Sequence, residues 1–169
     1  MQCDCKLDLN EDDDMAERPF IRDNDRSDDG IGEREPLRPA RMGELASLPV
    51  FFDLGAKRVV MAGGSAGAAW KAELLASAGA HVDFYAPSDD LEAEMAELLA
   101  APPVVGRIHH HDQPWSADIF AGAAIAVGDV ATEAEAQAFY CAAKAAGVPV
   151  NVVDKPAFCD FRFGSIVNR

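Results

Sequence analysis

The stretch that decides the fold is Lys57-Arg58-Val59-Val60-Met61-Ala62-Gly63-Gly64-Ser65-Ala66-Gly67-Ala68. Its first half is apolar with β-branched residues in the middle, which is typical of a buried strand, and it ends at a glycine pair. The segment 66–78 is then rich in Ala, Leu, Lys and Glu and stops at Gly79, as a helix with a C-terminal glycine does. The sequence therefore predicts a strand, a tight glycine turn and a helix, in that order.

The rest of the chain repeats this alternation. Ser88 is expected to cap a helix that runs to about Leu99, and Thr132 one that runs to Ala146. Strands that alternate with helices predict a parallel sheet, and right-handed crossovers place helices on both of its faces. The predicted fold class is α/β, a Rossmann-like doubly wound parallel sheet. Its further strands are expected at 81–85, 104–110, 123–127, 148–153 and 161–167.

Charge divides the chain into two parts. Residues 1–45 carry 14 acidic and 7 basic side chains and few apolar ones. Such a composition cannot bury enough surface to offset the loss of chain entropy. We therefore expect an acidic, disordered tail at 1–44 and one domain at 45–169. An interaction arm or a metal-binding arm that uses Cys3 and Cys5 is the alternative for the tail.

The overall composition excludes some classes of protein. The 169 residues have a net charge of −14, so a phosphate backbone is repelled and nucleic acid is not an expected partner. No apolar stretch approaches the length of about 18 residues that spans a membrane, and the first residues contain no apolar signal segment. Four cysteines without such a signal favour a reducing compartment. We expect a cytoplasmic protein with no membrane partner.

The glycine turn is the first candidate site. In a dinucleotide-binding fold the turn between the first strand and the first helix holds the pyrophosphate, because backbone N–H groups and the helix dipole face the anion. The G-x-G-x-x-G/A pattern maps onto Gly63, Ser65 and Ala68. If the middle position needs a positive φ, Ser65 costs roughly 1–2 kcal/mol there. The alternative is a scaffold whose glycines only make the turn.

The second candidate is Asp154, at the end of the apolar segment Asn151-Val152-Val153. Ligands of open α/β sheets bind outside the carboxyl ends of the strands, so Asp154 and the glycine turn are expected at one edge, where a carboxylate can accept a proton. An Asp that only caps the following turn is the alternative. Among His109, His110 and His111 only the first and third share a strand face, so we assign no metal site to them.

Three motifs, in order and with matching spacing, carry a family resemblance. They are Leu48-Pro49-Val50-Phe51-Phe52-Asp53-Leu54, then Gly63-Gly64 with Lys71-Ala72 and Leu74, then Asn151-Val152-Val153-Asp154 with Pro156, Cys159, Phe161, Phe163, Ser165-Ile166-Val167 and Arg169. Over residues 46–169 the chain resembles the N-terminal domain of siroheme synthase, a precorrin-2 dehydrogenase and sirohydrochlorin ferrochelatase.

The resemblance implies an activity, a cofactor and a set of site residues. NAD+ would take a hydride from the tetrapyrrole precorrin-2 to give sirohydrochlorin, into which many members then insert Fe2+ to make siroheme. The catalytic aspartate falls on Asp154, and the cofactor contacts fall on Gly63, Gly64, Ser65, Ala66, Gly67, Pro87 and Ser88. Family members continue with a dimerisation segment, which implies a homodimer of the full-length protein, and often with a methyltransferase domain; this chain ends at Arg169. A non-catalytic Rossmann module that binds a nucleotide or a tetrapyrrole is the alternative function.

Overall fold

The computed structural model describes residues 47–164, and the helices and strands in it belong to one compact unit. The tail predicted at 1–44 lies outside the described residues. The elements are β1 (Arg58–Ala62), α1 (Ala66–Ser77), β2 (His81–Tyr85), the 3-10 turn η1 (Ser88–Asp90), α2 (Ala93–Ala100), β3 (Arg107–His111), β4 (Ile125–Gly128), α3 (Glu133–Ala145), β5 (Val150–Val152) and the 3-10 turn η2 (Pro156–Phe158).

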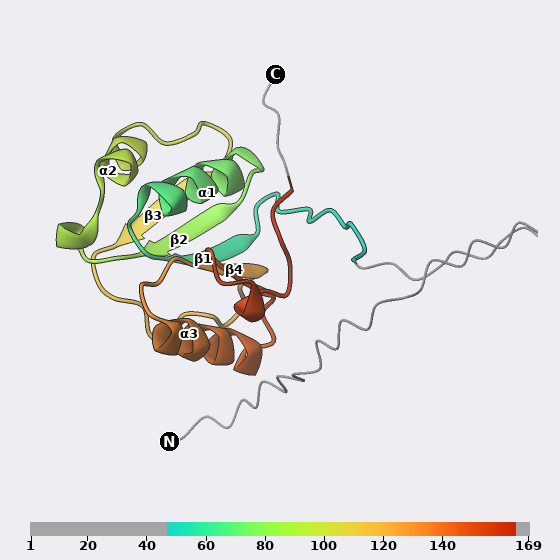
Figure 1. The fold of residues 1–169 in the computed structure, drawn as a ribbon. Helices are drawn as coiled ribbons and strands as arrows, with labels where there is room; N and C mark the ends of the chain where they lie inside the picture. Colours follow the sequence, from blue (N-terminus) through green and yellow to red (C-terminus); the bar gives the residue numbers. More distant parts are fainter. Residues whose placement is uncertain (1–46, 165–169) are drawn as a thin grey trace, which may run out of the picture. The chain divides into compact units, whose positions relative to one another are not determined.

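The five strands form one parallel sheet in the order β3-β2-β1-β4-β5. The chain moves outward from β1 through β2 to β3, and then returns to the other side of β1 for β4. The topological switch point, where open α/β sheets bind ligands, therefore lies between β1 and β4. Helices α1 and α2 cover one face of the sheet and α3 covers the other (Figure 1). The predicted α/β, doubly wound fold is confirmed.

The helices bury both faces of the sheet at β1, β4 and β5, whereas the edge strand β3 is partly exposed. Strands β1, β4 and β5 are almost entirely apolar and buried, as expected for parallel strands covered on both sides. Under α3 the ring of Phe139 packs edge-on against Phe120 at 5.0 Å and Trp115 at 5.2 Å between ring centroids. In the described part of the chain, no helix has both the length and the apolar character that crossing a membrane requires.

Three local predictions are wrong. Ser88 does not cap α2: it begins η1, Leu91 is extended, and Glu92 is the N-cap residue. The third strand starts at Arg107 rather than at Val104, whose side chain is fully exposed. The residues from 161 to 164 are irregular rather than a sixth strand, and the remainder of that predicted strand lies outside the described residues.

Candidate functional site

The carboxyl edge of the sheet begins with a turn that only glycine can make. Gly63 follows β1 with a φ of +100°, a conformation that L side chains rarely adopt. A Cβ atom on Gly63 would also lie 2.0 Å from the backbone oxygen of Asp129, which follows β4. The Gly63 turn thus lies directly against the end of β4, at the switch point of the sheet.

Ser65 has a role that the sequence did not reveal. Its φ is −74° and its ψ is 168°, so the strain expected for a non-glycine residue at this position is absent. Ser65 is the N-cap of α1: its Oγ accepts a hydrogen bond from the N–H of Ala68 at 3.2 Å. The same hydroxyl donates to the carboxylate of Asp129. Ser65 therefore joins the N-terminus of α1 to the end of β4.

The segment 90–92, from the end of η1 to the N-cap of α2, contacts the glycine loop. The backbone N–H of Glu92 donates to the carbonyl oxygen of Gly64 at 2.9 Å, and Glu92 Oε2 accepts from the N–H of Ala66, also at 2.9 Å. A Cβ atom on Gly64 would lie 2.5 Å from the backbone oxygen of Asp90. The first turn of α1 therefore already binds an anionic group, supplied by the chain itself.

The turn after β2 holds the other two residues expected to contact the cofactor. Pro87 precedes η1, and Ser88 donates its backbone N–H to Asp112 Oδ1 at 2.6 Å. This backbone hydrogen bond, with a weaker side-chain hydrogen bond from Ser88, lowers the pKa of the exposed Asp112 carboxyl below its usual value. The ends of β2 and β3 are thus tied together by an ionised carboxylate.

Asp154 lies at the same edge, two strands away from the glycine loop. It follows β5 with a φ of +57°, in the left-handed region that Asp and Asn adopt more readily than other side chains do. The backbone on either side is fixed, because Val153 N–H donates to the Gly128 carbonyl and Lys155 N–H donates to the Val152 carbonyl. The Asp154 side chain itself is exposed.

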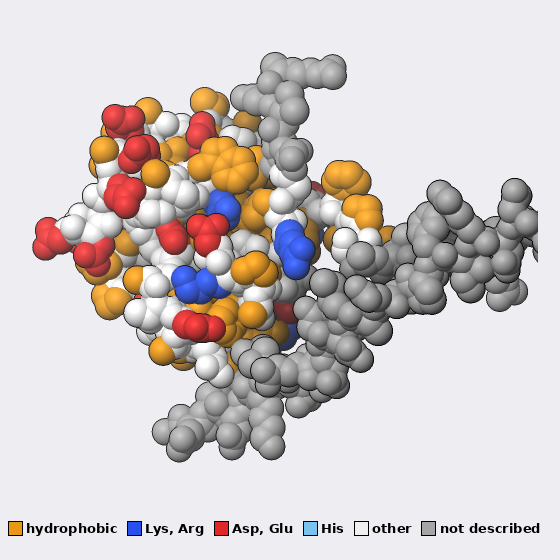
Figure 2. Space-filling model, in the orientation of Figure 1, with side chains coloured by type: hydrophobic (Ala, Val, Ile, Leu, Met, Phe, Trp, Pro, Cys, Tyr) orange, Lys and Arg blue, Asp and Glu red, His pale blue; other side chains and the backbone are white. Residues whose placement is uncertain are grey.

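A cavity of about 220 Å³ opens beside Asp154. Three cations line it, in a chain whose net charge is −14: Lys71, Lys155 and Arg162. Lys71 Nζ lies 5.3 Å from the ring centroid of Trp70 and 5.1 Å from that of Phe163. Figure 2 shows Lys and Arg side chains beside hydrophobic ones in the middle of one face, with some Asp and Glu side chains among them and further acidic ones toward α2 and η1.

Buried polar groups hold the wall of this cavity in place. The amide of Asn151 in β5 donates to the Phe161 carbonyl at 2.8 Å. The Cys159 thiol donates to the carbonyls of Val152 and Lys155. Burial raises the pKa of this thiol, so it remains protonated at neutral pH. Asn151 and Cys159 thus support the segment that carries Phe161 and Phe163, and neither needs a chemical role to explain its position.

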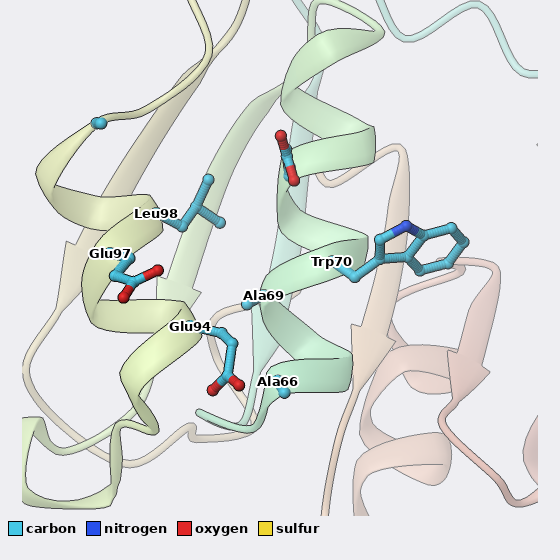
Figure 3. A pocket seen from close by; sticks show the side chains of 8 residues that line it. Ala66, Ala69, Trp70, Glu94, Glu97 and Leu98 are labelled. Atoms are coloured by element: carbon cyan, nitrogen blue, oxygen red, sulfur yellow. The ribbon is translucent and has the colours of Figure 1, made fainter. Parts of the chain in front are cut away.

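A larger groove lies between α1 and α2, on the outer side of these helices (Figure 3). Its volume is about 330 Å³, and three glutamates, Glu73, Glu94 and Glu97, line it. Trp70, half exposed, points away from α2 in this view. Carboxylates on both helices make this groove acidic.

The adjacent histidines on β3 pack against β2. His111 stacks on Tyr85 with 4.3 Å between ring centroids, and His109 contacts His111 edge-on, so these two share a strand face as expected. His110 hydrogen-bonds the Ala86 carbonyl on the opposite face. Within residues 47–164, no three His, Cys, Asp or Glu side chains are placed to hold a metal ion together.

Comparison with known proteins gives the domain a ligand class. Residues 50–165 match the sequence family described as "Putative NAD(P)-binding". The chain belongs to this NAD(P)-binding family. The residues of the glycine turn fit such a cofactor. Gly63 leaves no room for a side chain, and the Ala66 N–H in the first turn of α1 already donates to an anionic oxygen.

Curated relatives confirm the resemblance to siroheme synthase. The chain is 43% identical to the siroheme synthase of Thiobacillus denitrificans over 124 residues, and 36% identical to that of Nitrosomonas eutropha over 121. Both alignments cover 72% of this chain and 24% of the relative, so the chain spans about a quarter of the length of these proteins. A solved structure of SirC, precorrin-2 dehydrogenase, matches with a TM-score of 0.48 and 19% identity, over 72% of this chain and 54% of the other.

The structure brings together the predicted residues of the glycine turn and places Asp154 at the same edge. Sequence reasoning did not assign Glu92 or Asp129 to the glycine turn, nor Arg162 to the Asp154 cavity. The available signal for Glu92 is the cluster of acidic residues after Pro87, which the sequence pattern assigns only to the start of a helix. Nothing local in the sequence indicates that Asp129 accepts a hydrogen bond from Ser65, because that contact depends on the sheet order.

Proposed function

We propose that this chain is the NAD-dependent dehydrogenase domain that converts precorrin-2 to sirohydrochlorin. The observation that carries the proposal is the 36–43% identity to siroheme synthases over 121–124 residues. The cofactor class follows from the family, and Asp154 lies at the ligand-binding edge of the sheet. A cytoplasmic location, homodimerisation and the use of Fe2+ as a second substrate belong to the same proposal.

The cofactor would lie across the switch point. Gly63, Gly64, Ser65, Ala66 and Gly67 would hold its pyrophosphate at the first turn of α1, and Pro87 and Ser88 would contact the adenosine half at the end of β2. When bound, NAD+ supplies the acceptor for a hydride. The residues of the turn do no chemistry in this scheme; they fix the position of the cofactor by backbone contacts.

Asp154 would act as the base. Oxidation of precorrin-2 by NAD+ removes one hydride and one proton from the macrocycle, and gives sirohydrochlorin, NADH and H+. The exposed Asp154 carboxylate can take that proton and release it to water. The side chain is exposed, and backbone hydrogen bonds of Val153 and Lys155 hold the chain on both sides of it.

The lining of the cavity beside Asp154 suits an acidic substrate. Tetrapyrrole acids carry several carboxylates around a planar ring system. Lys71, Lys155 and Arg162 can bind such carboxylates, and Lys71 is flanked by the aromatic faces of Trp70 and Phe163. These side chains would orient the macrocycle with an oxidisable carbon toward the cofactor.

One observation favours a second function. The glycine turn is surrounded by the carboxylates of Glu92 and Asp129, and both of these already occupy hydrogen-bond donors of the loop. A loop in this state would suit a non-catalytic module that binds a tetrapyrrole beside Asp154 without using a nucleotide. The two functions differ in whether NAD+ binds.

Asp154→Asn tests the proposal. The amide keeps the shape of the side chain and, like Asp, is tolerated in the left-handed region, so the fold should be retained. We expect NAD+ binding within about twofold of wild type and a loss of precorrin-2 oxidation of about 10²–10⁴-fold, measured by the absorbance of NADH. Asp53→Asn is a matched control, because Asp53 precedes β1 at the opposite end of the strand and its Oδ1 only accepts from Gly55 N–H.

Three outcomes would contradict the proposal in different ways. Full oxidation rates in Asp154→Asn would exclude Asp154 as the base. Loss of NAD+ binding together with activity would give the residue a structural role. Tetrapyrrole binding by the wild-type chain without any NAD+ binding would establish the non-catalytic module instead.

A further inference from the structure

The contact between Glu92 and α1 is reciprocal and local. Glu92 N–H donates to the Gly64 carbonyl, and its Oε2 accepts from Ala66 N–H, each at 2.9 Å. Both partners belong to the turn that the proposed function assigns to the cofactor. The contact therefore involves one of the backbone donors that a cofactor phosphate would need.

A carboxylate and a phosphate compete for such a position. The first N–H groups of a helix have no partner within the helix, and together with the helix dipole they attract an anion. Ala66 N–H has one hydrogen atom, and Glu92 already accepts it. A second anion placed nearby would also experience repulsion from the Glu92 charge, in addition to that of Asp129 on the other side of the loop.

The Glu92 side chain can leave without disturbing the fold. It is exposed, and the segment is anchored by other groups: the backbone hydrogen bond to Gly64, and the buried side chains of Met95 and Leu98 on α2. Rotation of the Glu92 side chain would therefore expose the Ala66 N–H while the backbone stays in place.

We propose that Glu92 is an internal competitor of the cofactor, which occupies the phosphate position at the first turn of α1 and lowers the affinity for NAD+. This inference rests on the proposed function, because it requires that NAD+ binds at the Gly63–Gly67 turn. NAD+ binding then includes the displacement of the Glu92 carboxylate. Glu92 sets the cofactor affinity without touching the reacting atoms.

The test is calorimetric titration of the 169-residue chain with NAD+, and with ADP-ribose as a probe that lacks nicotinamide. Glu92→Gln removes the charge and keeps an oxygen that can accept from Ala66 N–H, so the N-terminus of α1 stays capped. We expect both ligands to bind about three- to tenfold more tightly to Glu92→Gln than to wild type. The difference in affinity between Glu92→Gln and wild type should be smaller in 0.5 M salt, because salt screens an exposed charge.

Glu97→Gln is the matched control. It makes the same change in net charge on α2, and Glu97 lies one turn beyond Glu94, away from Ala66 (Figure 3). We expect less than about a twofold effect on either ligand, because Glu92, and not Glu97, accepts the hydrogen bond from Ala66 N–H, and salt screens an exposed charge. An equal gain in both variants would show that total charge, rather than competition at Ala66, controls the affinity, and would overturn the inference.

The remaining outcomes separate this inference from the proposed function. Wild-type binding of NAD+ with unchanged or weaker binding by Glu92→Gln would overturn the role of Glu92 and leave the dehydrogenase proposal intact. Absence of NAD+ binding in wild type and in both variants would overturn both. Binding by Glu92→Gln alone would support both, and would show that the carboxylate blocks the site at the concentrations used.

Discussion

Replacing Ser65 with alanine is expected to destabilise the domain by about 1–2 kcal/mol. The N-cap hydrogen bond from Ala68 N–H to Ser65 Oγ accounts for about 1 kcal/mol of this. The hydrogen bond that the hydroxyl donates to Asp129 adds up to about 1 kcal/mol, a low value for a charged acceptor because the pair is partly exposed. The melting temperature should fall by about 3–10 °C in a domain of this size, measured by circular dichroism.

Two further variants at this position separate the possible causes. Ser65→Thr keeps the hydroxyl and should stay within about 0.5 kcal/mol of wild type. Ser65→Gly loses the bond to Asp129, although glycine is itself a tolerated N-cap, so a loss of about 1 kcal/mol is expected. If Ser65 instead had a positive φ, the glycine variant would be more stable than wild type by about 1 kcal/mol. A gain in stability for Ser65→Gly would refute the helix-cap assignment.

The remaining predictions concern the cofactor edge and the core. NADP+ should bind more weakly than NAD+ in calorimetry, because the acidic side chains after β2, Asp89 and Asp90, repel an added phosphate. Gly63→Val should abolish NAD+ binding, since a Cβ would lie 2.0 Å from the Asp129 oxygen; unchanged binding would place the cofactor elsewhere. The pKa of the Asp112 carboxyl is lowered, so its hydrogen bond from Ser88 N–H should persist at neutral pH. It should be lost only at a pH below the usual pKa of an aspartate, which an NMR titration of the Ser88 amide measures. Phe139→Ala should cost about 3–5 kcal/mol in urea unfolding.

The sequence was sufficient to predict the fold because the relevant forces are local. Apolar β-branched segments, helix-forming runs and glycine ends placed β1, α1 and β2 within one or two residues. The alternation of these elements implied the parallel sheet. The wrong predictions occurred where contacts from distant residues decide: Val104 and Val105 have strand-like side chains, yet the ladder with β2 begins at Arg107.

The same distinction applies to the candidate site. Gly63 and Asp154 could be located from sequence, since a turn after a strand and a strand end lie at a predictable edge. The partners of the glycine turn could not, because Glu92 reaches it from the segment after β2 and Asp129 from the end of β4. Their hydrogen bonds require the strand order, which places β2 and β4 on either side of β1.

The strand order also separates charge along the ligand-binding edge. The half of the edge at β2 and β1 carries the carboxylates of Asp89, Asp90 and Glu92, whereas the end at β5 carries Lys155 and the nearby Arg162. In the proposed function, the cations beside Asp154 would therefore attract a substrate rich in carboxylates to that cavity. A chain with a net charge of −14 can still bind an acidic macrocycle, because the field at the cavity depends on the cations nearest to it. The same field would hold the substrate next to Asp154, the proposed proton acceptor and the only carboxylate among the described residues that line this cavity.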